Sequence, residues 1–276
     1  MPVPPKMNKE IQITGKKIFY RIIGNGKPVV LIHGFGEESD VWRNQIEFLK
    51  DKFQLIIPDL PGSGKSEMID DMSMEGMAEV IKTILDSEFP KVPPSGGFRG
   101  AMIGHSMGGY ILLAFVEKYW NHLDALGLFH SSAYPDNEEK KTARRKGIEF
   151  INHHGAFEFL KTTTPNLFSP KTRDERPELI DEQISRLSNF SPAPLVSYYE
   201  AMMERPDRTE ILQKASVPVL FIMGKYDNAV PLEDGLEQCH LPEKSYIYIL
   251  HQSGHMGMLE EVDTSNRILE KFLLET

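Results

Sequence analysis

The most informative segment of this chain is Gly104-His105-Ser106-Met107-Gly108-Gly109. It follows a short apolar run at 101–103 and precedes residues with helical spacing. A G-x-S-x-G sequence between a strand and a helix is typical of a nucleophile elbow, a sharp turn that exposes a serine at the end of the strand. The turn strains the serine backbone, and the flanking glycines let neighbouring chain approach without a clash against a Cβ atom. We therefore predict that Ser106 is a nucleophile rather than part of an ordinary turn.

A serine hydroxyl is a weak nucleophile at neutral pH and needs a base within hydrogen-bond reach. Of the nine histidines, His255 is the best candidate, because it lies in a glycine-containing loop between the last apolar run and the last helical segment. Loops at the carboxyl ends of parallel strands are where α/β folds assemble their sites. His251 is the nearest competitor, but it falls at the end of the strand itself.

The base in turn needs an acidic partner that fixes its tautomer and stabilises the imidazolium. Asp227 follows the apolar run 217–223, so it too is expected at the carboxyl end of a strand. The order Ser106, Asp227, His255 matches the nucleophile–acid–base order that accompanies this elbow. Asp136, after the preceding strand, is a weaker candidate for the acid.

Two backbone amides are candidates for an oxyanion hole. Phe35 lies in the segment 33–36 (His-Gly-Phe-Gly) that ends the first long apolar run, and Met107 directly follows the predicted nucleophile. Amides at such turns can point at the charge that develops on a substrate carbonyl oxygen, and each donor is worth about 2.7–4 kcal/mol of transition-state stabilisation. We assign the amides of Phe35 and Met107 to the hole, with an ordinary strand-to-helix turn as the alternative.

Short apolar runs on both sides of the elbow predict a parallel sheet covered by helices on both faces, because such strands read as continuous apolar segments. These runs span 29–33, 55–58, 101–104, 125–129, 217–223 and, as a candidate last strand, 246–250. Helical patterns alternate with them over 40–50, 74–87, 108–119 and 257–274. The alternation predicts a doubly wound, mostly parallel α/β sheet. The opening segment 11–20 alternates apolar and polar residues, which predicts an antiparallel hairpin.

The alternation of strands and helices is interrupted between about 132 and 213. This stretch is charged, has helical periodicity and contains five prolines over 165–194, and strand-like residues resume at Val217. We predict a helical cap over the site. The cap divides the chain into a first core part (1–131), the cap itself (132–213) and a second core part (214–276).

The composition excludes several classes of protein. The 276 residues, 40% hydrophobic and 26% charged, suit one large α/β domain or a core with a small insert. The 31 basic and 40 acidic residues give a net charge of −9, which argues against a general nucleic-acid-binding surface. No apolar run is long enough for a membrane span and no secretory signal is visible, so we expect a cytoplasmic protein. The single cysteine, Cys239, excludes a disulfide framework and a multi-cysteine metal site, and we expect neither a metal nor another cofactor.

Several other segments are assigned no catalytic role. The segment 59–66 ends like a phosphate-binding loop, but that loop needs a glycine where Asp59 stands, and an acidic residue would repel phosphate. His251 and His255 lack the glutamate and the helix of a zinc-binding H-E-x-x-H motif. The basic run 140–146 is interpreted as a solvated helix face. The cap methionines, Met202 and Met203, are expected either to fill the core or to line a pocket.

Together these motifs resemble those of the α/β-hydrolase superfamily, in its small branch with a helical cap. The resemblance covers nearly the whole chain and rests on five segments in the same order, 33–36, 59–66, 104–109, 224–227 and 253–255. It implies the roles given above for the nucleophile, the acid, the base and the two oxyanion donors. It also implies a cap between two core strands and a structural role for the loop that begins at Asp59.

The predicted nucleophile narrows the choice within this superfamily. Ser106 separates the chain from haloalkane dehalogenases and epoxide hydrolases, which use aspartate, and the HGGG segment of hormone-sensitive-lipase-like members is absent. Serine members include carboxylesterases, perhydrolases, C–C bond hydrolases, lactonases and some receptors. The leading hypothesis is a serine hydrolase that cleaves small-to-medium acyl esters, its small-molecule partners, through an acyl-enzyme. The alternatives are a C–C bond hydrolase of a diketone-like substrate, or a ligand-sensing protein whose cap acts as a lid.

Overall fold

The computed structural model describes residues 6–90, 97–187 and 189–276. Within this part of the chain, one eight-stranded sheet has the order β1-β2-β4-β3-β5-β6-β7-β8. The strands are β1 (Lys6–Ile13), β2 (Lys16–Ile23), β3 (Lys27–Ile32), β4 (Phe53–Pro58), β5 (Gly100–His105), β6 (Leu123–Phe129), β7 (Val219–Gly224) and β8 (Ser245–Leu250). β1 and β2 form an antiparallel hairpin, β2 pairs antiparallel with β4, and β3 to β8 are parallel. The predicted mostly parallel sheet with an N-terminal hairpin is confirmed.

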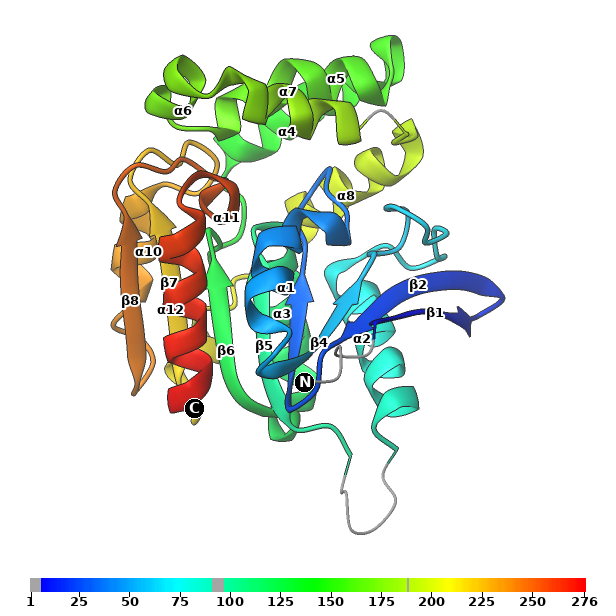
Figure 1. Ribbon diagram of the computed structural model, residues 1–276. Coiled ribbons are helices and arrows are strands. Elements are labelled where there is room, and N and C mark those ends of the chain that lie inside the picture. Colours follow the sequence, from blue (N-terminus) through cyan, green and yellow to red (C-terminus); the bar gives the residue numbers. More distant parts are fainter. Residues whose placement is uncertain (1–5, 91–96, 188) are drawn as a thin grey trace.

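Helices cover both faces of this sheet, which explains the continuous apolar strands. One hydrophobic cluster includes residues of α1 (Arg43–Leu49), α11 (Gly257–Glu260) and α12 (Val262–Glu275), and the other includes α2 (Met74–Glu88) and α3 (Met107–Tyr119) (Figure 1). In β3, Val29 and Leu31 belong to the first cluster, and Val30 and Ile32 belong to the second. The two clusters, separated by the sheet, are the core of a doubly wound fold.

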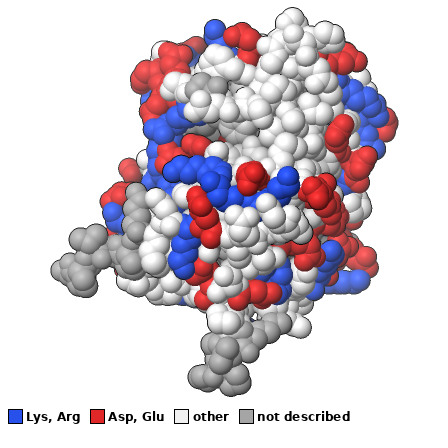
Figure 2. Space-filling view, turned by 90° about the vertical axis from the view of Figure 1, so that its right-hand side faces the viewer, with Lys and Arg blue, Asp and Glu red and all other residues white. Residues whose placement is uncertain are grey.

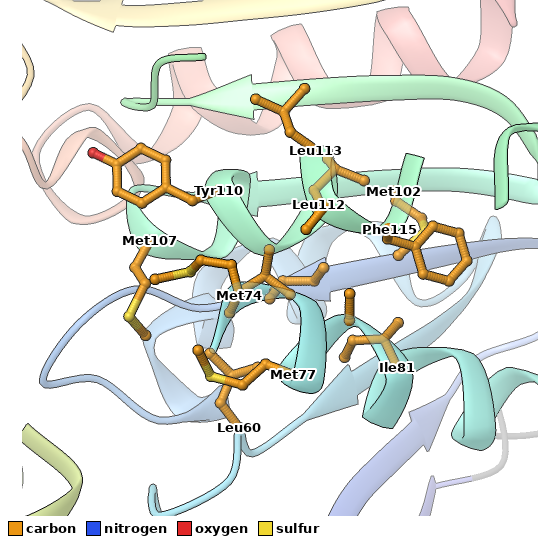
Figure 3. Packing of buried hydrophobic residues seen from close by; sticks show 14 of the residues in the cluster. Leu60, Met74, Met77, Ile81, Met102, Met107, Tyr110, Leu112, Leu113 and Phe115 are labelled. Atoms are coloured by element: carbon orange, nitrogen blue, oxygen red, sulfur yellow. The ribbon is translucent and has the colours of Figure 1, made fainter. Parts of the chain in front are cut away.

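The cluster beneath α2 and α3 extends to the elbow. Met74 and Met77 on α2 belong to the same packed cluster as Met107 and Tyr110 on α3 (Figure 3). Flexible methionine side chains fill irregular gaps in such a core. Because Met107 directly follows Ser106, this packing fixes the start of α3 and, with it, the position of the serine.

The C-terminal segment differs from the single helix expected over 257–274. The structure has two helices, α11 and α12, which are separated at Glu261, whose ψ of 63° is not helical. Oε2 of Glu261 accepts hydrogen bonds from the backbone N–H of Gln252 (2.8 Å) and from the Ser253 hydroxyl (2.7 Å). The break places this carboxylate against the loop that precedes α11. Helical periodicity could not reveal it, because the cause is a tertiary hydrogen bond.

In the described residues between β6 and β7, six α-helices follow one another. They are α4 (Glu138–His154), α5 (Ala156–Thr163), α6 (Pro170–Glu175), α7 (Pro177–Arg186), α8 (Pro192–Glu204) and α9 (Thr209–Gln213). α4 to α7 form a layer at one end of the sheet (Figure 1). Proline is the first residue of α6, α7 and α8, where its missing N–H would have no intrahelical acceptor. Prolines that begin helices therefore explain how this stretch can contain several prolines and still have helical periodicity. The cap boundaries at 132 and 213 stay predictions.

The surface carries both signs of charge. On the face drawn in Figure 2, a short row of Lys and Arg side chains is flanked by Asp and Glu. Among the helices within the described ranges, none has the length and apolar character needed to cross a membrane. α10 (Leu232–Gln238) follows β7.

Candidate active site

The turn between β5 and α3 has the strained backbone that the elbow motif predicts. Ser106 has φ 52° and ψ −119°, in a region that non-glycine residues rarely adopt. Its N–H donates to the Phe129 carbonyl (3.0 Å), and its carbonyl accepts from the Ser131 hydroxyl (2.8 Å). A Cβ atom on Gly108 would lie only 2.5 Å from the Ile32 carbonyl oxygen. Contacts with β6 and β3 therefore hold a conformation that costs on the order of 1–3 kcal/mol.

His255 and Asp227 meet in the loops that follow β8 and β7. Nδ1 of His255 lies 2.8 Å from Oδ2 of Asp227, and both side chains are buried. Oδ1 of Asp227 accepts the backbone N–H groups of Ala229 and Val230, both at 2.9 Å. These contacts fix the carboxylate. Because Nδ1 of His255 donates to it, Nε2 is the nitrogen that is able to accept a proton.

The surroundings move the pKa values of these two groups in opposite directions. Burial would raise the pKa of Asp227, but the neighbouring imidazoles hold it well below its usual range. Burial would lower the pKa of His255, but the Asp227 carboxylate raises it above its ordinary value. Asp227 is therefore ionised at any ordinary working pH, and its charge stabilises a proton on His255.

Ser106 and His255 line one cavity of about 220 Å³. The segment between β6 and β7 contributes Lys140, Arg144, Tyr199 and Met202 to its wall. Met202 is only 2% exposed and thus fulfils both roles considered for it, since it also packs in the core. In this conformation no hydrogen bond joins the side chains of Ser106 and His255, both of which are described; catalytic contacts of this kind often tighten only when substrate is bound.

The two amides predicted to form an oxyanion hole belong to residues beside the serine. Phe35 lies in the loop after β3 and lines the cavity, and Met107 is the first residue of α3. A Cβ atom on Gly34 would lie 3.1 Å from Cβ of Ser106, so this loop and the elbow are in close contact. Among the described contacts, neither amide donates to a protein acceptor. Their role as oxyanion donors stays a prediction.

His130 was not among the predicted site residues, yet it faces the same carboxylate. Its Nδ1 lies 3.2 Å from Oδ2 of Asp227, and its Nε2 accepts the backbone N–H of Gly257 at 3.2 Å. Nε2 is therefore unprotonated, and Nδ1 carries the hydrogen. Burial lowers the pKa of His130 to about 4, so the ring is neutral. A signal was available, because His130 directly follows the apolar run 125–129, just as Asp227 follows a later strand.

The ligand atoms of His130, Asp227 and His255 lie within 4.8 Å of one another, close enough to be considered as a metal site. Nδ1 of each ring faces the carboxylate, and Nε2 of His130 is already occupied by a backbone N–H. A cation would have to displace both ring hydrogens, because a ligating imidazole nitrogen is unprotonated. We therefore assign this group to the hydrogen bond between His255 and Asp227, with the His130 ring beside the carboxylate.

A second buried pair lies beneath the predicted oxyanion loop. Oε2 of Glu37 accepts the Gly34 N–H (2.7 Å) and lies 3.0 Å from Nδ1 of His105. Nε2 of His105 lies 3.0 Å from the backbone carbonyl oxygen of His255, which can only accept, so Nε2 carries a hydrogen. The pair connects the loop after β3, the elbow and the loop of His255. Glu37 was not predicted, because 68 residues separate it from His105.

Asp136, the weaker candidate for the acid, has other partners than a histidine. Its carboxylate is paired with Arg144 and with Arg205, the latter at 2.8 Å. The three side chains join the segment before α4, α4 itself and the residue after α8. Asp136 is therefore a structural counter-ion of two arginines.

The interpretation of 140–146 as a solvated helix face is wrong for three of its residues, because Lys140, Ala143 and Arg144 line the cavity. Gly147 and Ile151, further along α4, are buried. Residues 140, 144, 147 and 151 have the spacing of one helix face. That periodicity was visible in the sequence and would have placed Arg144 on the buried side.

Comparisons with known proteins agree with this geometry. A sequence model of the family described as alpha/beta hydrolase fold matches residues 27–262. A 2-hydroxy-6-oxononadienedioate/2-hydroxy-6-oxononatrienedioate hydrolase from Paraburkholderia phymatum is 27% identical, with 94% of this chain and 92% of that protein covered. A pimeloyl-(acyl-carrier protein) methyl ester esterase from Vibrio atlanticus is 26% identical, with 89% and 94% covered. The solved structure of a thermophilic esterase from Thermogutta terrifontis, with malate bound, has a TM-score of 0.88 at 28% identity and covers 98% of both chains.

The match to the family spans the core strands from β3 to β8, the elbow and the loops of Asp227 and His255. The similar fold of the T. terrifontis esterase extends over nearly the entire chain. The chain therefore belongs to the α/β-hydrolase family and is a hydrolase.

Proposed function

We propose that this hydrolase cleaves small-to-medium carboxylic esters by nucleophilic catalysis, with Ser106 as nucleophile, His255 as base and Asp227 as acid. The observation that carries the proposal is the cavity that Ser106 and His255 share, with His255 held through Nδ1 by the buried Asp227. The names of the V. atlanticus and T. terrifontis relatives support an ester bond as the target. The limited cavity volume supports a substrate of modest size.

The proposed reaction begins when Nε2 of His255 takes the hydroxyl proton of Ser106 and Oγ attacks the ester carbonyl carbon. The carbonyl oxygen becomes negatively charged and accepts the amides of Phe35 and Met107. His255 then gives its proton to the leaving alcohol, and an acyl-enzyme remains. A water molecule, deprotonated by His255, attacks the acyl carbon; the bond from that carbon to Oγ of Ser106 breaks, His255 returns the proton to Oγ, and the acid is released. Asp227 stays ionised in every step and stabilises the imidazolium.

A second candidate is the hydrolysis of a C–C bond in a diketone-like substrate. The P. phymatum relative and a Comamonas testosteroni protein, 25% identical to this chain, are named as hydrolases of 2-hydroxy-6-oxo dienoates. Both reactions use the same three side chains. Turnover of a vinylogous diketone, compared with that of p-nitrophenyl esters, separates them.

The test is intact-mass analysis after treatment with a fluorophosphonate, together with p-nitrophenyl ester turnover. Ser106→Ala is compared with wild type and with Ser185→Ala, which changes an exposed serine on α7. We expect one adduct and full turnover for wild type and Ser185→Ala, and neither for Ser106→Ala. Labelling or turnover of Ser106→Ala equal to that of wild type would contradict the proposal. Tight ligand binding without turnover would favour a sensing function instead.

A further inference from the structure

We propose that the active-site cavity contains a carboxylate-binding subsite formed by the guanidinium of Arg144, and that the preferred substrate is an ester with a free carboxylate. A half-ester of a dicarboxylic acid is such a substrate. The inference rests on the proposed ester hydrolysis and specifies its substrate class. It is drawn from a charge imbalance in the wall of the cavity.

A buried cluster of two guanidinium groups and one carboxylate adjoins the cavity. The Asp136 side chain is fully buried and is paired with both Arg144 and Arg205. Two positive charges and one negative charge leave one positive charge uncompensated. The Arg144 side chain is 18% exposed, so this excess charge is open to the cavity, where an anionic partner stabilises a partly desolvated cation. The cluster therefore favours an anion at the guanidinium that is open to the cavity.

Arg205 is not that guanidinium, because both of its Nη atoms already donate within the protein and its remaining nitrogen, Nε, is buried away from the cavity. Nη1 donates to Asp136 (2.8 Å) and to the Met202 carbonyl (2.7 Å), and Nη2 donates to the Tyr134 carbonyl (2.9 Å). The group also lies 3.8 Å from the centroid of the Tyr110 ring. Its side chain is 4% exposed and is not part of the cavity wall.

Arg144 is part of the wall and has a free donor. Nε and Nη2 donate to Asp136, which leaves Nη1 without a protein acceptor in the described chain. The guanidinium lies over the Tyr199 ring, 5.3 Å from its centroid, and the Phe35 ring stacks on Tyr199 at 4.3 Å. These rings and Asp136 hold the guanidinium in one orientation. A carboxylate is the anion whose planar shape and charge suit a fixed guanidinium.

The other ionisable groups near the cavity do not supply the missing negative charge. Two of them are already paired within the protein, Lys140 with Asp234 (3.1 Å) and Glu37 with His105 (3.0 Å). Asp227, moreover, does not line the cavity. A carboxylate on the substrate is therefore the complementary charge for Arg144.

The experiment compares substrates that differ in the charge of one distal group. Monoethyl succinate, glutarate and adipate carry a carboxylate, and the matching ethyl ester amides carry a neutral carboxamide of nearly the same size. We expect wild-type kcat/KM for at least one carboxylate ester to exceed that of its amide about tenfold or more, because charge-assisted hydrogen bonds are stronger than neutral ones. Ethanol release measures all the reactions.

Three variants locate the effect. Arg144→Met removes the charge and is expected to lower the carboxylate-over-amide ratio of kcat/KM about ten- to a hundredfold. Arg144→Lys keeps the charge and is expected to retain a higher ratio than Arg144→Met. Arg145→Met changes the neighbouring, exposed arginine on α4 and is expected to have the wild-type ratio.

Equal kcat/KM for charged and neutral esters in wild type would overturn the subsite, and so would an Arg144→Met variant that loses both activities in the same proportion. Ester hydrolysis would stand in either case. Failure of every ester, with no fluorophosphonate adduct, would instead overturn the proposed function. In that case, or if Arg144→Met does not fold, calorimetric binding to Ser106→Ala tests the subsite. Tighter binding of monoethyl glutarate than of its amide to Ser106→Ala supports the subsite, and equal binding overturns it.

Discussion

His130 and His255 face the same carboxylate oxygen of Asp227, at 3.2 Å and 2.8 Å respectively. The other oxygen accepts two backbone N–H groups, so four N–H groups surround one carboxylate. Burial would raise the pKa of Asp227, yet this surrounding holds it far below the ordinary value. The acid of the proposed triad is thus a fixed negative charge where the loops after β6, β7 and β8 meet.

Asp227→Asn removes this charge but keeps an oxygen that can accept the amides of Ala229 and Val230. We expect kcat/KM for an ester to fall about 10⁴-fold, because His255 loses the partner that fixes its tautomer and stabilises the imidazolium. Steady-state kinetics of the folded variant measure the effect. Asp181→Asn, on the exposed surface of α7, serves as the control. A loss of less than about tenfold would contradict the assignment.

Asp136→Ala is expected to affect stability rather than proton transfer. It leaves the guanidinium groups of Arg144 and Arg205 without their buried counter-ion, and removing one partner of a buried pair costs about 3–5 kcal/mol. Denaturant unfolding of Asp136→Ala and of the surface variant Asp181→Ala measures the difference. If Asp136→Ala is as stable as wild type, the pairing of Asp136 with the two arginines does not stabilise the fold.

The stability contributed by Asp136 should also depend on pH. Burial would raise the pKa of this carboxyl, but the two arginines hold it below its ordinary value. A lowered carboxyl pKa contributes stability that is present above the unfolded-state pKa and is lost as the pH falls through the folded-state pKa. The difference in unfolding free energy between wild type and Asp136→Ala should therefore shrink in acid. A difference that stays constant down to strongly acidic pH would contradict this origin.

The acidic limb of the activity profile should report His255. Burial would lower the pKa of this imidazole, but Asp227 raises it above the ordinary value of 6.5. Only the neutral ring can take the Ser106 proton, so kcat/KM should fall as the pH decreases, with a midpoint above pH 6.5. A pH profile at constant ionic strength measures the midpoint. A midpoint below 6.5 would mean that Asp227 does not act on His255 as proposed.

His130→Asn should move that midpoint to higher pH. The neutral imidazole of His130 faces the carboxylate of Asp227, and its removal lets more of the negative charge act on His255. Asparagine suits the positive φ of 49° at this position. The pH profile is compared with that of His154→Asn, an exposed histidine of α4. An unchanged midpoint would leave His130 with a packing role alone.

The sheet and the elbow follow from short-range patterns. A strand covered on both faces has no polar side, so each strand of the parallel sheet appears as a continuous apolar run. β5 and β6, for example, begin and end within two residues of the predicted runs 101–104 and 125–129. The strained φ of Ser106 likewise follows from a serine between glycines at a strand-to-helix turn. The break at Glu261 does not, because Glu261 accepts hydrogen bonds from the loop that precedes α11.

The amino-acid order alone was sufficient for the fold class, for the strained turn at Ser106 and for the strand ends that carry Asp227 and His255, because burial and turn chemistry act between near neighbours in the chain. It did not reveal that His130 faces Asp227, or that Asp136 joins Arg144 to Arg205. These contacts arise only when loops from separate strands meet at one end of the sheet. At this end of the sheet, burial makes the pKa and the stabilising effect of each charged group depend on its neighbours in the folded structure. Periodicity along the chain does not indicate those neighbours.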